Sequence, residues 1–119
     1  MILADTSIWV NHFRRGDAQL ARLLTEDEIG LHPFVLGEIA AGTLRHRARV
    51  LADLACLPQL AVVEEREVHH LLESRQLWSL GLGWVDLHLL AAALLARWNL
   101  LTVDHAMKHA AARLLIPCV

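Results

Sequence analysis

Four carboxylic acids in this chain follow or interrupt apolar segments, where charge is not needed for solubility. They are Asp5, Glu38, Asp86 and Asp104. A buried carboxylate is costly unless it is hydrogen-bonded, paired with a cation or bound to a metal ion. Four such costs in a short chain predict one shared use, a site for a divalent metal.

The chemistry that such a site would support is hydrolysis of a phosphodiester. Mg²⁺ and Mn²⁺ prefer hard oxygen ligands, usually a few carboxylates completed by water. An ion held in this way can activate water and stabilise charge on a phosphoryl oxygen. The ion also relieves the mutual repulsion of clustered carboxylates.

The elements that must position these acids alternate between apolar strands and helices. Strands are expected at residues 1–4, 28–32, 60–63 and 100–103, with an edge strand at 115–119. Helices are expected at residues 8–14, 17–24, 33–41, 44–56, 67–80, 84–98 and 105–114. Strands that are apolar on both faces and separated by helices predict an α/β fold, with a central parallel β-sheet flanked by α-helices on both sides.

The length of 119 residues suits a single domain spanning residues 1–119. Ligands of parallel sheets bind beyond the carboxyl ends of the strands. Asp5 and Asp104 fall at two such ends, and Asp86 falls in the first turn of the helix over 84–98. The fold class therefore predicts that these acids face one crevice.

Each acid also has a simpler explanation. Asp5 and Asp104 could be helix N-caps, and Asp86 could interact with the positive end of a helix dipole. Glu38 could pair with an arginine such as Arg45, although its neighbours one helical turn away are apolar and predict that it projects from an apolar face. All four explanations together are less economical than one shared site.

The basic residues carry a second signal. The net charge is −2, so no global basic field attracts polyanions, and every basic residue except Lys108 is arginine. The densest basic run is 45–49, Arg-His-Arg-Ala-Arg. This run could attract RNA phosphates or could simply be a solvated helix face. Arginine usage of this kind also follows from a GC-rich genome.

The sequence favours a cytoplasmic protein. The longest unbroken apolar run, 89–96, is far shorter than the roughly 20 residues of a membrane-spanning helix. The amino terminus lacks the pattern of a signal peptide, because Asp5 interrupts its apolar stretch. Cys56 and Cys118 are too few and too far apart to indicate a disulfide framework or a zinc site.

Taken together, these segments resemble a PIN domain, and specifically a VapC-type ribonuclease toxin of a type II toxin–antitoxin pair. The matching pieces are Ile-Leu-Ala-Asp-Thr-Ser at 2–7, Leu-Gly-Glu-Ile at 36–39 with Gly42, Trp-Val-Asp-Leu-His-Leu-Leu-Ala at 84–91, and Leu-Thr-Val-Asp at 101–104. No piece is specific alone, but their order and spacing cover essentially the whole chain.

The resemblance implies an endoribonuclease that depends on Mg²⁺, for which Mn²⁺ can substitute. Asp5 and Asp86 would be the principal metal ligands, and Glu38 and Asp104 would complete the catalytic cluster. The hydroxyl residues expected to position substrate or a cluster carboxylate are Thr6, Ser7 and Thr102. The fourth acid of the cluster, here Asp104, varies in the family.

The family further implies an RNA substrate, a homodimer, and a VapB-type antitoxin whose C-terminal segment fills the crevice in a higher toxin–antitoxin assembly. The alternative is a catalytically silent PIN-like module that binds a basic partner peptide or RNA in the acidic crevice. Convergence of all four acids favours catalysis, because binding alone does not require it.

Overall fold

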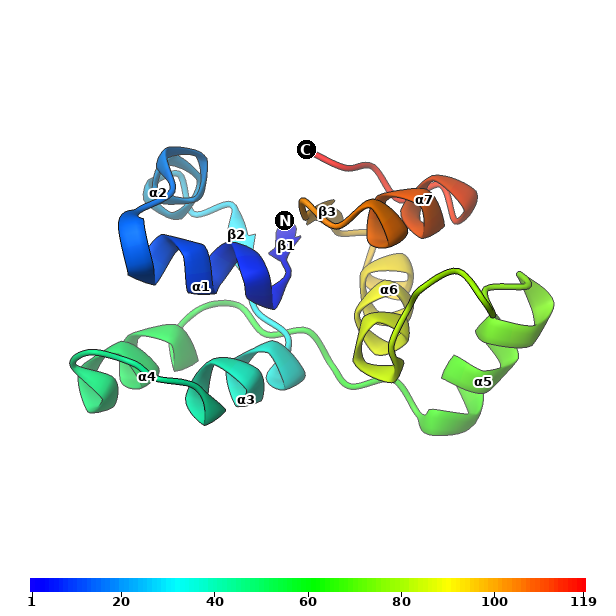
Figure 1. The fold of residues 1–119 in the computed structure, drawn as a ribbon, viewed down its shortest axis with the longest axis horizontal. Helices are drawn as coiled ribbons and strands as arrows, with labels where there is room; N and C mark the ends of the chain where they lie inside the picture. Colours follow the sequence, from blue (N-terminus) through cyan, green and yellow to red (C-terminus); the bar gives the residue numbers. More distant parts are fainter.

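A computed structural model describes all residues from 1 to 119 and has a small parallel sheet at its centre (Figure 1). Its strands are β1 (Ile2–Ala4), β2 (Ile29–Gly30) and β3 (Asn99–Leu101). The strand order is β2-β1-β3, and both neighbours of β1 run parallel to it. The first and last strands of the chain therefore lie side by side, which places the residues that follow them at the same edge.

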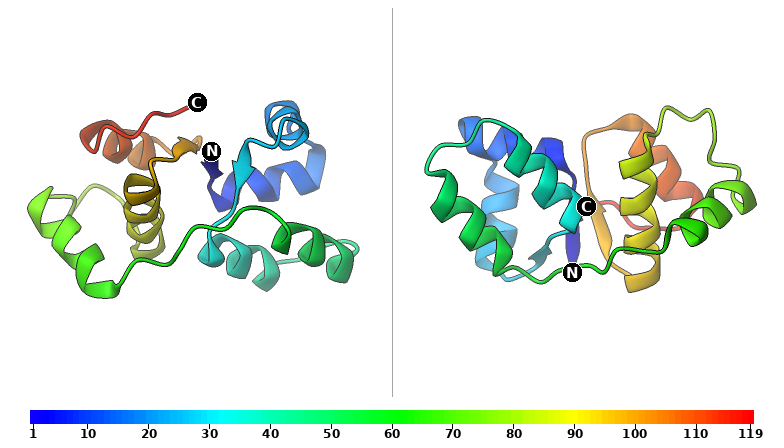
Figure 2. Two further views of the ribbon diagram at one scale, coloured as in Figure 1. Left: turned by 180° about the vertical axis from the view of Figure 1, so that it is seen from behind. Right: turned by 90° about the horizontal axis from the view of Figure 1, so that it is seen from below.

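Helices cover this sheet on both sides. They are α1 (Thr6–Arg15), α2 (Ala18–Thr25), α3 (Pro33–Ala41), α4 (Arg47–Ala55), α5 (Glu65–Ser74), α6 (Trp84–Ala96) and α7 (His105–Arg113). Helices α1 to α4 gather on one side and α5 to α7 on the other, and a long connection between α4 and α5 joins the two groups (Figures 1 and 2). The predicted α/β architecture is confirmed. None of these helices is both long and apolar enough to span a membrane.

Two predicted strands are reduced to single bridges. The segment 60–63 forms no strand, and pairing occurs earlier, where Gln59 lies opposite Leu31. Residues 115–119 contribute only a bridge between Cys118 and Leu100. Leu60 and Val63 are nevertheless buried, whereas Ala61 and Val62 are exposed. The apolar pattern of 60–63 therefore indicates burial correctly only at its two ends and does not reveal that the backbone ladder has ended.

The bounds of several predicted helices also differ: the helix expected at 8–14 begins at Thr6, and the helix expected at 84–98 ends at Ala96. Two helices differ more. The helix expected at 44–56 begins only at Arg47, because His46 has a left-handed backbone with φ of 52°. The helix expected at 67–80 ends at Ser74, before Gln76, whose φ is 53°. A residue with positive φ cannot continue a right-handed helix. Histidine and glutamine do not favour positive φ as glycine does, so the sequence does not predict either helix boundary.

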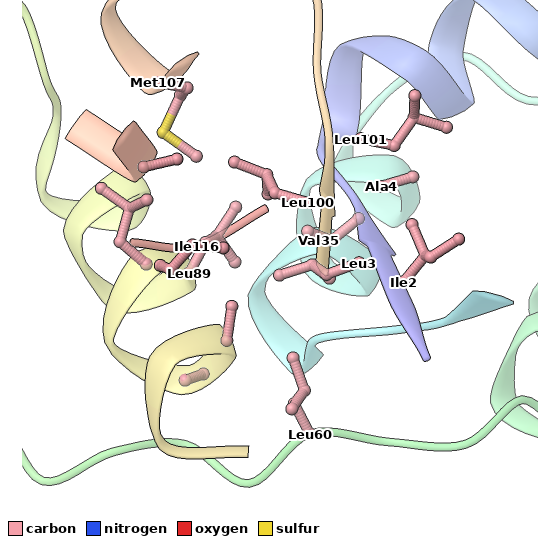
Figure 3. Packing of buried hydrophobic residues seen from close by; sticks show 14 of the residues in the cluster. Ile2, Leu3, Ala4, Val35, Leu60, Leu89, Leu100, Leu101, Met107 and Ile116 are labelled. Carbon is pink, nitrogen blue, oxygen red and sulfur yellow. The ribbon is translucent and has the colours of Figure 1, made fainter. Parts of the chain in front are cut away.

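The two faces of the sheet pack into different groups of helices. Leu100 points toward α6 and α7, where Leu89 and Met107 lie, whereas Ala4 and Leu101 point to the opposite side (Figure 3). All five side chains are buried. Because a slip of one residue would turn every strand side chain to the wrong face, this packing fixes the register that aligns the ends of β1 and β3.

Candidate active site

Asp5 is the buried centre of the site. It immediately follows β1, and its backbone N–H donates to the Leu101 carbonyl at 3.1 Å, which extends the pairing with β3 by one residue. Its side chain is 7% exposed and caps α1: Oδ1 accepts from the Ser7 hydroxyl at 2.7 Å and from the Ile8 N–H at 3.3 Å. Both simple N-capping and a role in a larger site are therefore compatible with its local geometry.

Thr102 links Asp5 to Asp104 across the sheet edge. The Thr102 hydroxyl donates to Oδ2 of Asp5 and accepts from the Asp104 N–H at 3.1 Å. Thr102 is buried and directly follows β3. With Ser7 and Ile8 on Oδ1 and Thr102 on Oδ2, the Asp5 carboxylate is held in one orientation, as a preorganised ligand requires.

Asp86 approaches from the other group of helices. It is the third residue of α6, and its Oδ2 accepts from the Gly83 N–H at 2.9 Å. Partial burial raises the pKa of Asp86 above its ordinary value, the Gly83 hydrogen bond opposes this, and the charges of Asp104, Asp5 and Glu38 add to the increase. The four acids predicted from sequence therefore lie close enough for three of them to disfavour ionisation of the fourth.

Glu38 and Asp104 lie at the exposed rim. Glu38 projects from α3, and one of its carboxylate oxygens accepts from the Thr6 hydroxyl at 2.6 Å. The expectation that Glu38 projects from an apolar face is wrong, because its side chain is exposed. Asp104 is exposed and caps α7, with Oδ1 accepting from the Ala106 N–H at 2.8 Å. Asp5 is thus the only buried member of the four, and Asp86 is half-buried.

No cation of the chain neutralises this cluster. The two salt bridges in the structure join Arg22 to Glu26 and Arg66 to Glu64, and neither includes any of the four acids. In particular, the alternative pairing of Glu38 with Arg45 does not form. Four carboxylates without a cationic partner, three of which act electrostatically on Asp86, make a negatively charged site suited to a cation from solution.

The donors fit Mg²⁺ chemically, since all of them are hard oxygens. As the side chains lie, no group of three or more His, Cys, Asp or Glu residues is placed to hold one ion. Mg²⁺ is usually bound by one or two carboxylates and keeps several waters. An ion bound here would therefore take one or two of these carboxylates and complete its shell with water, rather than occupy a closed cage.

The helix that carries Glu38 is anchored by a buried histidine. His32 is the N-cap of α3, and its Nδ1 accepts from the Phe34 N–H at 2.9 Å. Its Nε2 has no partner, and the side chain is fully buried. Burial, with a smaller contribution from the charge of His88, lowers the pKa of His32 to about 4. His32 is therefore neutral in the native state at physiological pH.

This burial predicts that acid weakens the fold. The unfolded chain binds a proton at His32 below its ordinary pKa of 6.5, whereas the folded chain binds one only below about 4. Stability is therefore lost as pH falls from 6.5 to about 4, by an amount on the order of 3 kcal/mol. His32→Asn keeps a cap acceptor without a titrating group. Urea unfolding at several pH values is expected to show a flatter profile for this variant, and parallel profiles would contradict the assignment.

A hollow beside the cluster is lined partly by residues that the motifs did not single out. This hollow, of about 470 Å³, is lined by Thr6 and Ser7 together with Asn11 and Arg14. The spacing of Ser7, Asn11 and Arg14 by four and three residues could have indicated this shared face of α1. The motifs missed Arg14 because it lies two helical turns beyond the end of the first motif, residues 2–7.

With this geometry, the comparison with known sequences defines the class of protein. Residues 2–113 match the PIN domain family. This span includes all three strands of the sheet and all four acids. The chain belongs to the PIN domain family.

Relatives of this chain include a ribonuclease from one bacterial species. The chain is 47% identical over 113 residues to ribonuclease VapC32 of Mycobacterium tuberculosis strain CDC 1551 / Oshkosh, an alignment that covers 94% of this chain and 91% of the relative. The same values hold for ribonuclease VapC32 of strain H37Rv. The resemblance to a VapC-type PIN domain that the motifs indicated is confirmed.

Proposed function

We propose that this chain is a metal-dependent endoribonuclease, the toxin of a VapBC-type toxin–antitoxin pair, built as a single PIN domain. The observation that carries the proposal is the cluster of Asp5, Glu38, Asp86 and Asp104, which has no cationic partner. Burial raises the pKa of Asp86, and the charges of the other three acids add to this increase. The name of its relatives, ribonuclease, supports RNA as the substrate.

In this proposal Asp5 and Asp86 hold Mg²⁺, which Mn²⁺ can replace. When bound, the ion would neutralise charge on the scissile phosphate and ease ionisation of the attacking water. Asp5 is kept in position by Ser7, Ile8 and Thr102. This rigidity matters because small misplacement of a catalytic group has a large effect on rate.

The exposed acids have a different role in the proposal. Glu38 and Asp104 face solvent, where they can accept a proton from water or orient it toward the phosphate. The Thr6 hydroxyl donates to Glu38 and thereby holds its carboxylate near the amino end of α1. Ser7 lines the neighbouring hollow, and its hydroxyl donates to Asp5, so this residue would lie beside a bound substrate while it orients Asp5.

The partners follow from the same assignment. We propose a cytoplasmic homodimer that a VapB-type antitoxin inhibits by occupying the acidic crevice, in a higher toxin–antitoxin assembly. An antitoxin segment with basic side chains would be attracted by the four uncompensated carboxylates.

Metal removal tests the proposal. Purified chain freed of antitoxin is expected to cut RNA with Mg²⁺ or Mn²⁺ and to stop in EDTA, because the carboxylates alone cannot neutralise a phosphate. A melting temperature that rises with added Mn²⁺ would report binding independently of cleavage. Cleavage that continues unchanged in EDTA would refute the metal dependence. Absence of both cleavage and a metal-induced stability increase would favour the silent binding module.

A further inference from the structure

Two hollows beside the candidate active site share one arginine. The first contains Thr6, Ser7 and Arg14. The second, of about 420 Å³, lies between α1, α3 and the segment leading into α4, and it contains Glu38, Phe13, Arg14 and Arg45. Each hollow thus reaches from a residue of the acidic site to an arginine, and Arg14 stands between them.

Both arginines are free to bind an anion. Arg14 and Arg45 are exposed, and neither forms a salt bridge or donates a side-chain hydrogen bond within the chain. By contrast, the neighbouring Arg15 donates to Asn11 at 2.7 Å. A basic residue in the last turn of a helix also complements the helix dipole, but this explains neither the pairing of Arg14 with Arg45 across one hollow nor their closeness to Glu38.

The geometry of α1 makes Arg14 a fixed extension of the site. Asp5 caps this helix and Ser7 lies in its first turn, so Arg14 is about 10 Å further along the same rigid element. A guanidinium presents a planar fork that binds two phosphate oxygens at once. An RNA strand whose scissile phosphate lay at the acids could therefore place a flanking phosphate at Arg14.

We propose that Arg14 and Arg45 are positioning residues that bind backbone phosphates flanking the scissile one in the RNA substrate. This inference rests on the proposed nuclease function. The chemistry of the second hollow favours RNA over a basic peptide, because two unpaired guanidinium groups attract phosphates and repel cationic side chains. The exposed Phe13 side chain, which lines the same hollow, gives a nucleobase an apolar surface to cover.

The test measures RNA affinity separately from cleavage. The full chain carrying Asp5→Asn is titrated in EDTA with a short fluorescent single-stranded RNA of mixed sequence. Adding Arg14→Gln or Arg45→Gln is expected to weaken binding about tenfold in each case. The slope of log affinity against log salt should fall by about 0.7 for each RNA phosphate that the variant no longer neutralises. Arg14→Lys should retain most of the slope but not the full affinity, because it keeps the charge without the fork.

Arg75→Gln is the matched control, because Arg75 is also exposed but lies at the end of α5, outside both hollows. It is expected to bind RNA like the Asp5→Asn parent. Unchanged affinity and salt slope in Arg14→Gln and Arg45→Gln would overturn the inference. So would equal weakening in Arg75→Gln, or a lowered melting temperature that accounts for the weaker binding.

Failure of this inference is distinguishable from failure of the proposed function. If the chain with native Asp5 cuts RNA with Mg²⁺ while the arginine variants bind RNA normally, only the phosphate contacts are refuted. If that chain cuts no RNA but Arg14→Gln still weakens binding, the phosphate contacts stand without catalysis. If Arg14→Gln instead tightens binding of an arginine-containing peptide and leaves RNA affinity unchanged, the hollow is a peptide site and the inference is refuted.

Discussion

Asp5→Asn is expected to reduce RNA cleavage by about a thousandfold or more while the protein remains folded. An amide cannot replace the anionic oxygen that would hold the metal, and the metal is worth several kcal/mol of transition-state stabilisation. The fold should survive because asparagine is as good an N-cap as aspartate, so the bond from the Ile8 N–H is retained. Single-turnover cleavage and circular dichroism would measure the two effects.

Asp17→Asn provides a control of the same chemistry. Asp17 is the N-cap of α2, where its Oδ1 accepts from the Leu20 N–H at 2.9 Å, as Asp5 does for α1. It lies outside the acidic cluster, so the variant should cut RNA at the rate of the unmodified chain. If Asp5→Asn cut RNA equally fast, Asp5 would be only a helix cap and the proposed catalytic role would be lost.

Asp86→Asn is expected to abolish cleavage and, without metal, to stabilise the protein. The variant loses the second metal ligand but also removes a charge that burial and three neighbouring acids disfavour. Removal of such a functional charge typically adds about 0.5–2 kcal/mol to the free energy of unfolding. Thermal unfolding in EDTA and the cleavage rate in Mg²⁺ would therefore change in opposite directions.

The stabilisation expected for Asp86→Asn should depend on pH. The folded-state pKa of Asp86 is raised above 3.8, so the unmodified chain loses stability as pH rises through that folded value. The advantage of Asp86→Asn should therefore be present at neutral pH and disappear as pH falls toward 3.8. Mg²⁺ should raise the melting temperature of the unmodified chain but not of the variant.

Glu67→Gln is the control for Asp86→Asn, because Glu67 is another first-turn carboxylate, on α5, that belongs to no part of the cluster. It should change neither cleavage nor the response to Mg²⁺. An Asp86→Asn variant that is less stable than the unmodified chain in EDTA would show that the Gly83 hydrogen bond outweighs the repulsion.

The sequence was informative about the site wherever the signal is local. An acid directly after an apolar run marks the end of a buried strand, and this correctly places Asp5 at the sheet edge and Asp104 just beyond β3. The resemblance implied that Thr102 bonds a cluster carboxylate, and its hydroxyl does donate to Asp5. Such features depend on a few neighbouring residues and on the general geometry of parallel sheets.

Features that depend on distant contacts could not be predicted. The exposure of Glu38 is set by how α3 lies against α1, which its apolar neighbours in sequence do not reveal. The end of pairing after Leu60 reflects the path of the chain rather than residue type. Arg14 could not be recognised from a sequence motif. It lines the same hollow as Arg45 only because α1 packs beside the segment leading into α4.

The hydrogen bond from Thr102 to Asp5 spans 97 residues of sequence, and this separation has a consequence for synthesis. A ribosome makes Asp5 well before it makes Thr102 and Asp104. While the chain is growing, β1 has no β3 to pair with and the acids are not assembled. The proposed nuclease site would therefore assemble only after β3 and the residues that follow it have been synthesised, and the growing chain would be inactive toward RNA before that point.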